Sequence, residues 1–122
     1  MRRFLDRFGR FELDPVNSGI DAATLWGERV SALYDYSVRD REAFLAALAA
    51  EVAGDQGGFA TFGAARVVWE MLGKDALDTP SAWPLIEAGI AFKQARGLSS
   101  LHLTGYEQEH LQRRARLRPP PE

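Results

Sequence analysis

Glycines and helix-capping residues divide most of this sequence into stretches in which apolar side chains recur at helical spacing. The clearest stretch opens at Thr79 and Pro80, which suit the N-cap and the first helical position, and it closes at Gly97. No long segment alternates apolar and polar residues as a half-buried strand does. The sequence therefore predicts an all-α fold, a compact array of four to five helices.

The same signals place the individual elements. Helices are predicted over residues 21–37, 40–53, 59–72, 80–96 and 105–116. Residues 3–9 are also expected to be helical, although Phe11 and Leu13 would suit a short strand. Residues 98–103 alternate imperfectly and give at most one short extended segment. We expect the helices over 40–53 and 59–72 to form the inner layer, with close helix packing at Gly63 and Gly89.

Size and composition favour one ordinary globular domain. The chain has 122 residues, 46% of them hydrophobic and 26% charged, and we expect a helical domain over residues 1–118 with a flexible proline-rich tail at 119–122. The absence of cysteine excludes a disulfide framework and a thiolate metal site. With no export signal and no apolar run near the roughly twenty residues that span a bilayer, a cytoplasmic location without membrane contact is expected.

Charge is distributed unevenly along the chain. The net charge is −2, yet residues 11–109 hold seven basic and fifteen acidic groups, and both ends are basic. In the helix expected over residues 21–37, the side chains of Asp21, Glu28 and Asp35 share one face. The opposite, apolar face comprises Ala22, Ala23, Trp26, Val30 and Leu33. This acidic face favours a basic protein partner over nucleic acid, and simple solvated charge is the plainer alternative.

The recurrent motifs of catalysis are missing from the sequence. There is no Gly-x-Ser-x-Gly elbow and no Ser-x-x-Lys pair, and residues 54–58 lack the lysine and the spacing of a phosphate-binding loop. Glu107 and His110 have the Glu-x-x-His spacing of di-iron bundles, but such sites need a second copy. We therefore predict no metal site and no cofactor, and we expect His110 to be a solvated surface histidine.

These observations favour a non-enzymatic cytoplasmic binding protein, of the immunity or antitoxin kind, that meets a basic partner through Asp21, Glu28 and Asp35. The alternative is a small enzyme or ligand-binding domain with a pocket between helices. That pocket would be lined by Trp69, Trp83, His102, Tyr106, Glu107 and His110. Association of identical copies through the weakly apolar helix over residues 105–116 is a third hypothesis.

Overall fold

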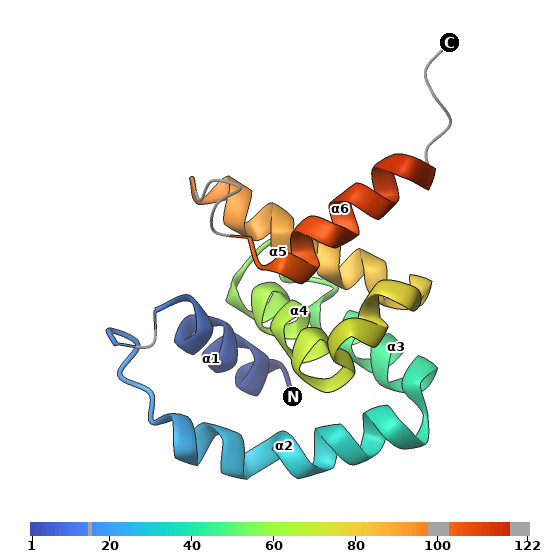
Figure 1. Ribbon diagram of the computed structural model, residues 1–122. Helices are drawn as coiled ribbons and strands as arrows, with labels where there is room; N and C mark the ends of the chain where they lie inside the picture. Colours follow the sequence, from blue (N-terminus) through green and yellow to red (C-terminus); the bar gives the residue numbers. More distant parts are fainter. Residues whose placement is uncertain (15, 98–102, 118–122) are drawn as a thin grey trace.

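The computed structural model describes residues 1–14, 16–97 and 103–117, and within them the chain is all-helical, as predicted (Figure 1). The six α-helices of this part are α1 (Arg2–Leu13), α2 (Ala22–Arg39), α3 (Arg41–Val52), α4 (Phe59–Leu72), α5 (Trp83–Ala95) and α6 (Gly105–Leu117). Two 3-10 helices, η1 (Gly73–Asp78) and η2 (Pro80–Ala82), join α4 to α5. The described residues thus hold more helices than the four to five expected. Residues 98–102 of the predicted extended segment, and the tail at 119–122, lie outside the described residues.

The N-terminal segment is a complete helix, so the strand alternative for Phe11 and Leu13 is wrong. Phe4, Leu5 and Phe8 recur at helical spacing and are all buried. Leu13 is the last residue of α1, because Asp14 precedes a proline and that position disfavours helical backbone.

Helix α4 lies at the centre of the fold, and α1 and α5 are its main neighbours (Figure 1). Glycine makes both contacts close. A Cβ atom on Gly63 would overlap the carbonyl oxygen of Leu5, and one on Gly89 would lie 2.5 Å from the Cβ of Ala65. The predicted close packing at Gly63 and Gly89 is therefore confirmed.

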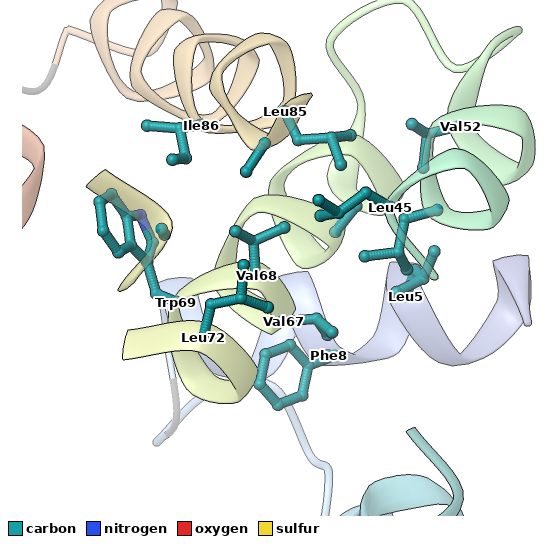
Figure 2. Packing of buried hydrophobic residues seen from close by; sticks show 14 of the residues in the cluster. Leu5, Phe8, Leu45, Val52, Val67, Val68, Trp69, Leu72, Leu85 and Ile86 are labelled. Carbon is teal, nitrogen blue, oxygen red and sulfur yellow. The ribbon is translucent and has the colours of Figure 1, made fainter. Parts of the chain in front are cut away.

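The expected inner layer needs a correction, because α1 rather than α3 is the principal partner of α4. Gly9 explains the preference, since a Cβ at Gly9 would overlap the carbonyl oxygen of Phe59. Figure 2 shows buried side chains of α1, α3, α4 and α5 converging in one cluster. Those labelled from these helices include Leu5, Phe8, Leu45, Val52, Val67, Val68, Leu72, Leu85 and Ile86.

Helix α2 runs along the edge of the molecule, beside α1 and α3 (Figure 1). Its described buried side chains are Leu25, Leu33 and Ser37. Ala23, which was expected on the apolar face, is exposed, so the buried face is rotated toward Leu25. The side chains of Ala22, Trp26 and Val30 lie outside the described part.

Several predicted helix ends are confirmed by their hydrogen bonds. Asp40 accepts from the backbone N–H of Ala43, and Thr104 and Glu107 form a reciprocal capping box. Thr79 does not cap α5; its hydroxyl donates to the carbonyl oxygen of Asp75, and the α-helix begins three residues after Pro80. The predicted single helix over residues 80–96 is therefore divided. Its first three residues form the 3-10 helix η2, and the α-helix follows from Trp83.

Asp55 caps the central helix from the turn that precedes it. Its carboxylate accepts hydrogen bonds from the backbone N–H and the hydroxyl of Thr61, at 2.8 and 2.9 Å, and lies 3.4 Å from Arg2. Gly58 leaves room for this contact, since a Cβ there would lie 2.7 Å from the carboxylate. The N-terminus of α4 is therefore occupied by the chain's own anion.

Replacing Asp55 by alanine is expected to lower the free energy of unfolding by about 1–2 kcal/mol at pH 7. Burial alone would raise the pKa of Asp55, but the hydrogen bonds from Thr61 and the charge of Arg2 outweigh it and lower the pKa below 3.8. The carboxylate's contribution is therefore complete above the unfolded pKa and is lost as the pH falls through the lower folded pKa. Urea unfolding followed by circular dichroism should show the difference shrink below pH 3.8.

The control for this comparison is Glu70→Ala, which removes an exposed carboxylate of the same helix. That variant should stay within about 0.5 kcal/mol of the wild type. A deficit for Asp55→Ala that is the same at acid and neutral pH would show that the charge of the cap is irrelevant.

Candidate functional site

A buried ion pair joins α5 to α6. Glu107 accepts from the ammonium group of Lys93 at 2.7 Å and from the backbone N–H of Thr104 at 3.0 Å. Both charged side chains are almost fully buried, and the ammonium group lies 5.9 Å from the centre of the Phe62 ring. Because the capping box fixes Glu107 in the first turn of α6, its carboxylate can meet Lys93 only if α6 lies against α5. This pair positions a helix.

His110 lies one turn further along α6 and contacts the same neighbour. It is 1% exposed, so the expectation of a solvated surface histidine is wrong. Nε2 of His110 is 3.1 Å from Oε1 of Glu87, which also accepts from the guanidinium of Arg114 at 2.8 Å. The histidine is buried because Glu107 and His110 share the helix face that α6 turns toward α5.

The charge state of Glu87 follows from these contacts. Partial burial alone would raise its pKa, but the hydrogen bonds from His110 and Arg114 outweigh this effect and lower the pKa. Glu87 is therefore ionised at neutral pH and can accept from both neighbours. The basic C-terminal part of α6 folds back onto the acidic body in this way, as Arg113 also does with Asp78 at 2.7 Å.

The residues predicted to line one pocket are divided between two shallow hollows. One hollow, of about 360 Å³, is bordered by Trp69 and by Tyr106, whose rings stack at 5.5 Å. The other, of about 380 Å³, is bordered by Trp83 together with Arg113 and Arg116. Glu107 and His110 are buried in the contact between α5 and α6, and His102 lies outside the described residues.

The three predicted partner-binding acids also have different surroundings. Asp21 caps α2, and hydrogen bonds from the hydroxyl and backbone N–H of Thr24 lower its pKa. The side chain of Glu28 lies outside the described part. Asp35 is exposed and makes no hydrogen bond or ion pair within the described structure. Asp35 is therefore exposed without a described partner, whereas the exposed Asp21 is engaged as a helix cap.

Two large apolar side chains flank Asp35 on the solvent side of α2, and sequence reasoning overlooked them. Tyr34 is 54% exposed and Val38 is 68% exposed. The two are four residues apart and so share a face, while Leu33 next to them is buried. The four-residue spacing of Tyr34 and Val38 was visible in the sequence. The predicted apolar face omitted Leu25, so the position of the exposed face was predicted incorrectly.

Acidic groups without a basic partner concentrate on α2 and α3. Elsewhere, most described acids pair with a basic residue, as Glu12 does with Arg66 and Asp75 with Arg41. Asp35, by contrast, has no partner, and Asp40 bonds to the backbone rather than to a basic side chain. Even with Arg29 and Arg39 of α2 counted, the described acids that lack a basic partner outnumber the unpaired bases along this edge.

Other classes of site find little support in the described ranges. No three His, Cys, Asp or Glu side chains among these residues gather closely enough to hold a metal ion. None of the described helices is long and apolar enough to cross a membrane. Comparisons of the chain with protein-family models, with curated proteins and with solved structures find no match.

Proposed function

We propose that this chain is a binding protein that docks a basic protein partner on the outer face of α2. The observation that carries the proposal is the exposed pair Tyr34 and Val38 beside the unpaired Asp35. Contact surfaces between proteins combine an apolar centre, often aromatic, with a polar rim that sets the partner's charge. Tyr34, Val38 and Asp35 supply the aromatic, apolar and acidic parts of such a surface on the exposed side of α2.

The way α2 is attached to the body supports this role. Its 18 residues make it the longest helix among those described, yet its described buried side chains are only Leu25, Leu33 and Ser37. Most of the α2 side chains that the structure describes are exposed. A partner can cover these side chains without disturbing the core.

Charge identifies the kind of partner. The edge formed by α2 and α3 carries the acidic surplus described above, which attracts lysine and arginine side chains and repels nucleic acid phosphates. The partner is therefore a protein with basic residues around an apolar groove or ridge. A cytoplasmic immunity or antitoxin protein that covers a basic toxin is the form of this proposal that best suits a small chain without a catalytic motif.

Affinity capture from a native cell extract tests the proposal when the bait is varied. A basic protein should be retained by the wild type and lost from Asp35→Lys and Val38→Asp baits, and its retention should fall as ionic strength rises. Glu70→Lys is the matched control, since it reverses an exposed acid on α4, and it should retain the partner. Equal capture by all four baits would overturn the proposal, as would retention of only nucleic acid or of the chain itself.

A further inference from the structure

A second surface feature lies between the first turns of α1 and the middle of α2. It is a hollow of about 320 Å³ lined by Met1, Arg3, Phe4, Arg7 and Arg29. Among the lining residues that the structure describes, three are arginines and none is acidic. The hollow is separate from the outer face of α2 proposed above, since it opens on the side of α2 that faces α1.

Helix geometry explains why the three arginines converge. Arg3 and Arg7 are four residues apart and lie one above the other on α1. Arg29 lies four residues from each of the two buried leucines of α2, so it stands on the face that α2 turns to the body. Contacts between α1 and α2 are few, and the arginines border the space that remains between them.

Among the described arginines, these three differ from most of the others because they meet no described carboxylate or aromatic ring. Arg2, Arg10 and Arg113 each meet a carboxylate, the last two at 2.7 Å. Arg3, Arg7 and Arg29 make no hydrogen bond or ion pair with any described residue. Asp6, the acid nearest in sequence to Arg3 and Arg7, is engaged by Arg10. Three like charges around one hollow repel each other, and a bound anion would relieve that repulsion.

We propose that this hollow binds the phosphate group of a phosphorylated small molecule through Arg3, Arg7 and Arg29. The planar guanidinium group matches phosphate oxygens in pairs, and three such groups suit a multiply charged anion better than a single carboxylate. The volume is at the lower end of small-molecule sites, roughly 300–1,000 Å³. It therefore has room for the group that carries the phosphate, against the apolar side chains of Met1 and Phe4.

Titration of the ¹⁵N-labelled chain with pyrophosphate, followed by NMR, tests this site. The expected result is saturable shifts around Arg3, Arg7 and Arg29, with inorganic phosphate acting at the same signals more weakly. Arg7→Gln and Arg29→Gln should each weaken binding by about tenfold or more, because each removes a charge-assisted hydrogen bond. Since neither side chain makes a hydrogen bond or ion pair with a described residue, both variants should keep the wild-type circular dichroism spectrum.

Arg39→Gln supplies the matched control, because Arg39 is an exposed arginine of α2 that does not line the hollow. It should leave pyrophosphate affinity unchanged. Three results would overturn the proposal: shifts that do not saturate at millimolar pyrophosphate, an equal loss for Arg39→Gln, or tighter binding of a single-stranded oligonucleotide that survives both Arg7→Gln and Arg29→Gln. The last result would indicate a nucleic acid surface instead.

Discussion

Replacing Gly63 by alanine is expected to lower the free energy of unfolding by about 3 kcal/mol or more. The added Cβ would overlap the carbonyl oxygen of Leu5 and approach the backbone nitrogen of Gly9. These are backbone atoms of α1, so no side-chain rotation relieves the overlap. The two helices would have to separate, and buried contacts such as those of Phe8 and Val67 would loosen.

Gly27→Ala is the control for this substitution. Gly27 lies inside α2, and a Cβ added there meets nothing within 4 Å. Alanine should stabilise that helix by up to about 1 kcal/mol, because it restricts the unfolded chain and favours helix. Urea unfolding followed by circular dichroism gives both values. If Gly63→Ala and Gly27→Ala shift the midpoint equally, the close approach of α1 and α4 does not determine stability.

Lys93→Met should have the second large effect, a loss of about 3–5 kcal/mol in the free energy of unfolding. Methionine keeps the length of the side chain but leaves the Glu107 carboxylate buried without its 2.7 Å ammonium partner. A buried charge that has lost its counter-charge cannot recover its hydration. We expect α6 to detach first, since this pair holds it to α5.

The double variant Lys93→Met/Glu107→Gln separates the charge effect from lost packing. Glutamine can still accept from the backbone N–H of Thr104, so the double variant should be more stable than Lys93→Met alone. Lys74→Met, at an exposed lysine, should stay within about 0.5 kcal/mol of the wild type. A loss below about 1 kcal/mol for Lys93→Met would mean that the pair contributes little net stability.

The all-α fold was predictable because its signals are local. Asp40 and the pair Thr104 and Glu107 indicate helix starts within four residues of sequence. In the structure they make the predicted capping hydrogen bonds. Gly63 and Gly89 were also informative, since a glycine inside an apolar helix weakens it unless another backbone needs the space. A glycine of this kind therefore marks a residue at which another helix packs closely.

What approaches that residue is not a local property. Gly9 occupies the matching place on α1, but nothing in the sequence pairs it with Gly63 rather than with another small residue. The burial of His110 was also not predictable from local sequence. Helix α6 is mostly polar, and its contacts with other elements, such as those with Glu87 and Lys93, fix which side faces inward. Exposure of such a residue depends on how two helices meet.

The candidate sites depended even more on tertiary arrangement. Arg3, Arg7 and Arg29 are ordinary surface charges in the sequence, and only the packing of α2 beside α1 brings them to one hollow. The exposed face of α2 was missed because the predicted buried face was rotated relative to the observed one. Ala23 is exposed and Leu25 is buried.

The contact between α1 and α4 also determines the order in which the chain can assemble. Arg2 and Asp55, which meet at one end of this contact, are 53 positions apart in sequence. The first helix therefore lacks its main packing partner until the fourth has been made, and α2 and α3 form the loop that closes between them. Closing such a loop has an entropic cost before any core contact forms. On the ribosome, the contact between α1 and α4 could therefore form only after about half the chain has been synthesised.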